Sequence, residues 1–120
     1  MRCSARGTIS TNDPIAAEKL IQAGADVDWK GNSGKTLASY AAGLNSYTIL
    51  RLLLDHGADY RVIDKTNGLT AVQIFGSNYR LMQSSSESGR QYREIAVWFE
   101  KRGVSIERAR DQWELWQNKL

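Results

Sequence analysis

Apolar residues recur at helical spacing in several segments of the chain. One predicted helix begins at Pro14, where Asp13 is suited to cap the first turn, and ends at Gly24, because glycine readily adopts the left-handed conformation. The helix predicted over Tyr47–His56 carries leucine and isoleucine around most of its circumference, as expected of a helix packed between two neighbours. We expect Gly57 to end this helix.

Further helices are predicted in the second half of the chain. Apolar spacing predicts a helix over Thr70–Leu81 and a partner helix over Arg90–Arg102, with the polar segment Gln83–Gly89 as an exposed loop between them. A last amphipathic helix is predicted over 105–120. Its apolar stripe consists of Ile106, Ala109, Trp113, Trp116 and Leu120. We interpret this helix as a cap on the fold, and a stripe that awaits a partner is the alternative.

The helix and its closing turn repeat along the chain. The sequence reads LIQAGADVD at 20–28 and LLLDHGADY at 52–60, which sets Gly24 and Gly57 33 residues apart (57 − 24). A weaker third copy, WFEKRGVSI, lies at 98–106. Between the copies, GNSGKTLASYAA aligns with KTNGLTAVQIFG, and Thr36 is placed to cap a short helix. A period of this length indicates stacked pairs of helices.

A 33-residue period with a Gly-x-Thr start and a helix that ends in Gly-Ala-Asp resembles the ankyrin repeat. The resemblance covers 14–106, although the family's Thr-Pro-Leu-His hallmark survives only in part, as TLASYAA. It implies an all-α solenoid of about two and a half to three helix-turn-helix units with short hairpin turns. The expected single domain comprises a half repeat (12–28), a repeat (29–61), a repeat with a long loop (62–104) and a C-terminal capping helix (105–120). Because the first unit lacks a first helix, we expect a chain shortened at its N-terminus.

One segment imitates a nucleotide-binding loop. The sequence GNSGKT ends like the motif Gly-x-x-x-x-Gly-Lys-Thr, but Trp29 stands where that motif has its first glycine, and no apolar strand precedes it. One repeat later, Leu69 takes the place of Lys35. We therefore interpret the segment as the tip of a turn and expect no bound nucleotide.

The other chemistry-bearing residues are expected to have structural roles. His56 lies at a helix end, where it interacts favourably with the last carbonyls. Asp26 and Asp59 occupy the same place in two repeats, so we expect each to accept a hydrogen bond from a local backbone amide. Cys3 is the only cysteine, which excludes a disulfide within the chain. We expect no enzyme, no metal and no cofactor.

Composition narrows the choice of partners. The 120 residues carry a formal net charge of +3 without a block of like charges. We therefore do not expect nucleic acid to be the partner, and we keep a basic nucleic-acid binder only as a lesser alternative. No segment is apolar over the length of a membrane span, and the chain as written starts without a signal peptide. We expect a cytoplasmic protein, or a periplasmic one if an N-terminal segment is missing.

The resemblance implies a non-catalytic module that binds another protein through a concave face and the tips of its turns. Carried onto this chain, the contact positions in the first turn are Trp29, Lys30, Asn32, Ser33 and Lys35. Those in the next turn are Ile63, Lys65, Thr66 and Leu69. The indole of Trp29 either anchors the partner or packs on the neighbouring turn. The lysines on this edge, Lys30, Lys35 and Lys65, either favour an acidic partner surface or form a solvated edge without a binding role.

The style of sequence is most similar to that of short bacterial ankyrin proteins, through LLLDHGADYRVIDKTNGLTA and the ending REIAVWFEKRGVSI. Proteins of this style are often encoded beside type VI secretion lipase effectors and block them by binding. The resemblance therefore implies an alternative function, that of an immunity protein that neutralises a secreted lipase.

Overall fold

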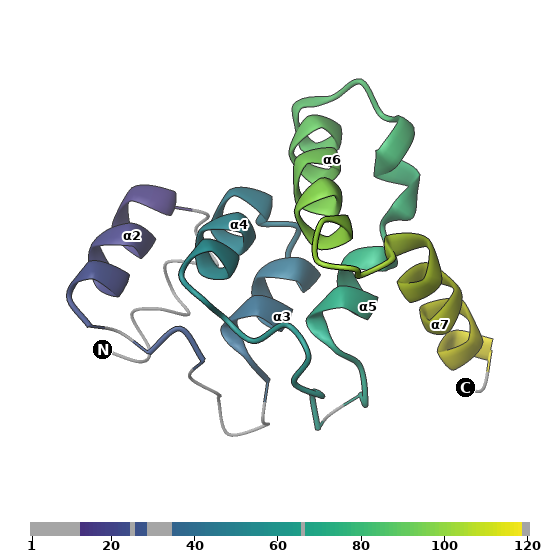
Figure 1. Ribbon diagram of the computed structural model, residues 1–120, viewed down its shortest axis with the longest axis horizontal. Helices are drawn as coiled ribbons and strands as arrows, with labels where there is room; N and C mark the ends of the chain where they lie inside the picture. The colour runs from purple at the N-terminus through teal and green to yellow at the C-terminus, as the bar shows by residue number, and fades with distance from the viewer. Residues whose placement is uncertain (1–12, 25, 29–34, 66, 119–120) are drawn as a thin grey trace.

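The fold consists of two rows of helices. The computed structural model describes residues 13–24, 26–28, 35–65 and 67–118, which form six α-helices and one 3-10 helix. One row holds α2 (Pro14–Gln22), α4 (Tyr47–Asp55) and α6 (Glu87–Glu100), and the other holds α3 (Leu37–Gly43), α5 (Ala71–Gly76) and α7 (Ile106–Asn118) (Figure 1). The 3-10 helix η1 (Tyr79–Gln83) packs against α6. The all-α class predicted from the sequence is confirmed.

Local side chains cap the first turns of α2, α3 and α5, and the caps Asp13 and Thr36 confirm predictions from the sequence. Asp13 Oδ1 accepts a hydrogen bond from the Ala16 amide at 3.1 Å, and Pro14 is the first residue of α2. Thr36 Oγ1 accepts from the Ser39 amide at 3.1 Å and caps α3. One repeat later, Thr70 caps α5 and exchanges hydrogen bonds with Gln73 in a complete capping box.

The same arrangement closes α3, α4 and α6. A residue with positive φ follows each helix, namely Asn45 at 59°, Gly57 at 88° and Gly103 at 79°. The next amide then donates to a carbonyl five residues back at 2.9–3.0 Å, in the pairs Ser46–Ala41, Ala58–Leu53 and Val104–Phe99. The weak third copy of the repeat in the sequence therefore ends its helix in the same way as the second copy.

Aromatic residues fill the core between the last helix pairs. The rings of Phe75 and Tyr92 stack with their centroids 4.0 Å apart, and Tyr47 meets both rings edge-on. The buried Tyr92 hydroxyl donates to the Phe75 carbonyl at 2.6 Å. Burial raises the pKa of Tyr92, so its phenol keeps the proton that this hydrogen bond requires.

Polar contacts also join neighbouring repeats. Asp28 Oδ1 accepts a hydrogen bond from the Asp59 amide at 2.7 Å, which ties the turn after α2 to the turn after α4. Asn78 Nδ2 donates to Asn45 Oδ1 at 2.5 Å, between equivalent positions at the ends of two first helices. The register between repeats is thus fixed by hydrogen bonds in addition to apolar packing.

Replacing Asp28 with alanine is expected to lower the free energy of unfolding by about 1 kcal/mol, because the Asp59 amide loses its acceptor. Asp28→Asn retains an oxygen at the same place and should keep most of that stability. Urea unfolding followed by circular dichroism measures both variants. If Asp28→Ala unfolds at the wild-type urea concentration, the contact contributes nothing to the coupling of the repeats.

Two predicted boundaries are wrong in the third unit. The helix expected over Thr70–Leu81 ends at Gly76, where the Ser77 hydroxyl donates to the Ile74 carbonyl at 2.6 Å, and the chain continues into η1. The helix expected over Arg90–Arg102 already begins at Glu87, because Ser86 caps it through the Gly89 amide. Most of the expected loop Gln83–Gly89 therefore belongs to η1 and α6.

The last helix lies along α5. Ser105 Oγ accepts a hydrogen bond from the Arg108 amide at 3.1 Å at the start of α7. Ile106 and Ala109 of the predicted stripe are buried, whereas Trp113 and Trp116 are half-buried. Leu120 lies outside the described residues. Within the part of the chain that the structure describes, no helix combines the length and apolar character needed to cross a membrane.

Candidate functional site

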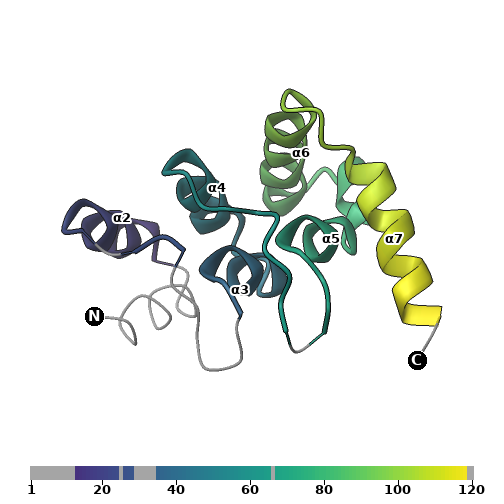
Figure 2. The ribbon, with the colours of Figure 1, turned by 60° about the horizontal axis from the view of Figure 1, so that its bottom comes forward.

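The turn between α4 and α5 extends away from the helices (Figure 2). It is closed by two backbone hydrogen bonds, from the Asp64 amide to the Leu69 carbonyl at 2.8 Å and from the Gly68 amide to the Asp64 carbonyl at 2.7 Å. Gly68 has a φ of 74°, and the Asn67 side chain accepts from the Leu69 amide at 2.9 Å. These local bonds give the turn a defined shape.

Buried and exposed side chains alternate along this turn. Asp64 and Leu69 are buried and hold the turn against the helices, while Ile63 and Lys65 face solvent, with 61% of Ile63 exposed. The prediction of Leu69 as a contact residue is therefore corrected, because only 4% of it is exposed. The turn thus leaves Ile63 and Lys65 exposed to solvent.

The first predicted turn is described only at its end. Lys35 is half-exposed, and its Nζ lies 6.0 Å from the centroid of the Tyr40 ring on α3. The remaining predicted contact residues lie outside the described residues, namely Trp29, Lys30, Asn32, Ser33 and Thr66. Their role as contacts stays a prediction from the sequence.

The two aspartates expected to stabilise turns do so. Asp26 Oδ1 accepts from the Asp28 amide and Asp59 Oδ1 accepts from the Arg61 amide, each at 2.9 Å. His56 is the residue that follows the last turn of α4. Among the residues that the structure describes, no group of three or more His, Cys, Asp or Glu side chains could hold a metal ion.

A basic pocket of about 480 Å³ lies between the turn after α4 and the start of α7. Arg61, Arg102 and Arg108 line it together with Gln73 and Gln112, and none of the described residues that line it is acidic. Sequence reasoning missed these arginines, because they come from three separate segments whose proximity depends on how α7 folds back. We call this feature the arginine pocket.

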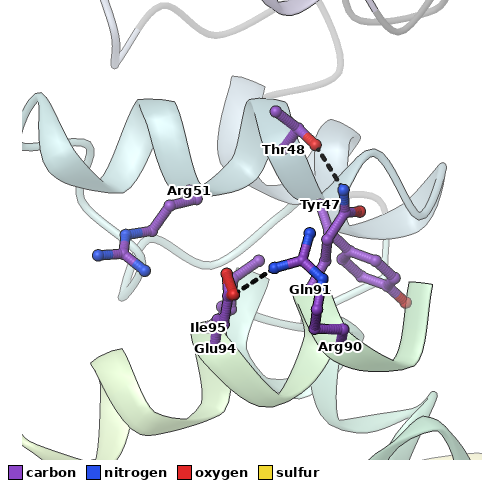
Figure 3. A pocket seen from close by; sticks show the side chains of 7 residues that line it. All are labelled: Tyr47, Thr48, Arg51, Arg90, Gln91, Glu94 and Ile95. Carbon is purple, nitrogen blue, oxygen red and sulfur yellow. Dashed lines mark hydrogen bonds and ion pairs between the residues drawn. The ribbon is translucent and has the colours of Figure 1, made fainter. Parts of the chain in front are cut away.

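A second, smaller pocket of about 210 Å³ lies between α4 and α6 and has a different charge pattern. Figure 3 shows Arg90 paired with Glu94, and Gln91 donating to the Thr48 hydroxyl at 3.0 Å. Arg90 also pairs with Glu87, whose hydrogen bond and charge raise the pKa of Arg90. Arg51 pairs with Asp55 at 3.1 Å. The charges of this pocket are thus balanced within the protein.

The repeated part of the chain is similar in sequence to known proteins. Residues 20–75 match the family model described as ankyrin repeats (many copies). A Treponema pallidum (strain Nichols) protein described as ankyrin repeat-containing is 42% identical over 55 residues, which are 46% of this chain and 18% of that relative. The chain thus spans only a small part of the relative's length. The matched segment therefore consists of ankyrin repeats, and stacked helix pairs continue beyond it.

Proposed function

We propose that the chain is a non-catalytic module that binds a partner protein through the turn after α4 and the row formed by α3, α5 and α7. Ankyrin repeats are in general protein–protein interaction modules, since stacked repeats offer an extended surface. The observation that carries the proposal for this chain is the exposure of Ile63 on a turn that the buried Asp64 and Leu69 hold against the helices.

The physical argument is one of preorganisation. A large apolar side chain on a fixed turn can enter a partner's pocket without the entropy loss of ordering a loop. Lys65, two positions further on, adds a positive charge that can steer an acidic partner towards the same edge. The half-buried Tyr40 and Ile74, on α3 and α5, offer further apolar contact area along the same row.

Ile63→Asp is expected to weaken the complex by about tenfold or more, because it places a charge at the centre of the contact. The matched control is Val97→Asp, the same kind of change at another exposed aliphatic residue, 47% exposed on α6 in the other row. Partners crosslinked in cells and identified by mass spectrometry would be purified and titrated by calorimetry. Equal losses for the two variants, or a loss for Val97→Asp alone, would contradict the proposed surface.

The immunity function expected from the style of the sequence is a narrower form of this proposal. It makes the partner a secreted lipase, so mixing the two proteins should abolish lipase activity while Ile63→Asp restores it. A lipase that binds and stays fully active would restrict the proposal to the general module.

A further inference from the structure

The two connections that lead into α5 and α7 differ in length. α4 ends at Asp55 and α5 begins at Ala71, with the projecting turn between them, whereas α6 ends at Glu100 and α7 already begins at Ile106. The short connection forms no projecting turn (Figure 2). The arginine pocket occupies the space beside it, so the departure from the repeat pattern creates the pocket.

The guanidinium groups of the pocket have few anionic partners of their own. Arg102 lies over the Trp98 ring, 3.6 Å from its centroid, and donates to the Trp98 carbonyl at 3.0 Å. Neither Arg102 nor Arg108 forms an ion pair with any carboxylate in the described part of the chain, and Arg61 pairs with Asp59 at 3.3 Å. The pocket between α4 and α6 differs, because both of its arginines are paired.

We infer that the arginine pocket receives aspartate or glutamate side chains from an acidic segment of the partner protein. Guanidinium groups bind carboxylates through paired hydrogen bonds. At the wall, Gln112 Oε1 accepts a hydrogen bond from Gln73 Nε2 at 3.1 Å, which leaves the Gln112 amide nitrogen as a further donor. Arg61, which lines the pocket, stands two residues before Ile63, so one peptide segment can contact both the exposed turn and the pocket. This continuity favours a peptide as the occupant. The inference rests on the proposed function and adds the chemistry of the partner.

The test uses a blocked hexaglutamate peptide titrated into the whole protein and followed by amide resonances in NMR spectra. Binding at the pocket should shift the resonances of Arg61, Gly103 and Arg108, and a hexaglutamine peptide should not. Shifts spread evenly over all exposed basic residues would overturn the inference, since they would show unspecific attraction. Shifts caused by inorganic phosphate but not by hexaglutamate would also overturn it and make the pocket a phosphate site.

Arg108→Gln should weaken hexaglutamate binding by about tenfold. Arg90→Gln removes the same charge from the paired site and should leave the affinity unchanged. Both residues are exposed, and circular dichroism checks that both variants are folded. Equal affinities for the two variants would refute the inference. The peptide titration requires no natural partner, so its failure leaves the effect of Ile63→Asp on the natural complex as a separate result.

Discussion

Replacing Leu53 with alanine is expected to lower the free energy of unfolding by about 2–5 kcal/mol. Leu53 belongs to α4, which lies between α2 and α6 in its row, and only 2% of the side chain is exposed. The Leu53 carbonyl also accepts a hydrogen bond from the Ala58 amide at the end of the helix. Because this bond holds the backbone at Leu53 in place, the backbone cannot shift to fill the cavity that the substitution leaves. Urea and thermal unfolding measure the loss.

The control for Leu53→Ala is Leu115→Ala, since Leu115 on α7 is 64% exposed. The same change should there alter stability by less than about 0.5 kcal/mol. If the melting temperature of Leu53→Ala fell by only about 2 °C, Leu53 would not be a core residue between layers. A chain of few repeats has little stability to spare, so Leu53→Ala is also expected to reduce the yield of folded protein.

The parts of the fold that sequence predicted are those governed by local signals. Thr36 caps a helix through its hydroxyl, and Gly57 ends one through its positive φ. Both act within their own turns, so the sequence alone predicts their effect. The repeat then predicted which turns are equivalent. The boundaries of 12–28, 29–61, 62–104 and 105–120 as repeat units stay a prediction.

The errors arise where distant segments decide the outcome. Local apolar spacing continues past Gly76, but α5 ends there, at the residue whose added Cβ would meet the backbone of α7. From the resemblance to ankyrin repeats, Leu69 is expected to contact the partner protein. It is instead buried and anchors the turn in the core. At the candidate site, the sequence indicated Ile63 and Lys65 through the repeat, while the arginine pocket depends on a tertiary contact that no local pattern records.

Gly76→Ala is expected to destabilise the protein by about 1–3 kcal/mol, although alanine favours helices. A Cβ at Gly76 would lie 2.8 Å from the Arg110 amide nitrogen and 3.0 Å from the Ala109 carbonyl carbon. Both are backbone atoms, so relief requires α7 to move away from α5 as a whole. Urea unfolding gives the loss of stability, and faster tryptic cleavage after Arg108 and Arg110 reports the displaced helix.

Gly43 provides the matched control, because it ends α3 as Gly76 ends α5 in the next repeat. The nearest atom to an added Cβ at Gly43 is Ile74 Cγ2 at 4.0 Å, an ordinary contact. Gly43→Ala should therefore keep or slightly raise stability and leave tryptic cleavage of α7 unchanged. If the two variants proved equally stable, α7 would not be held against α5. The arginine pocket, whose wall α7 forms, would then lose its structural basis.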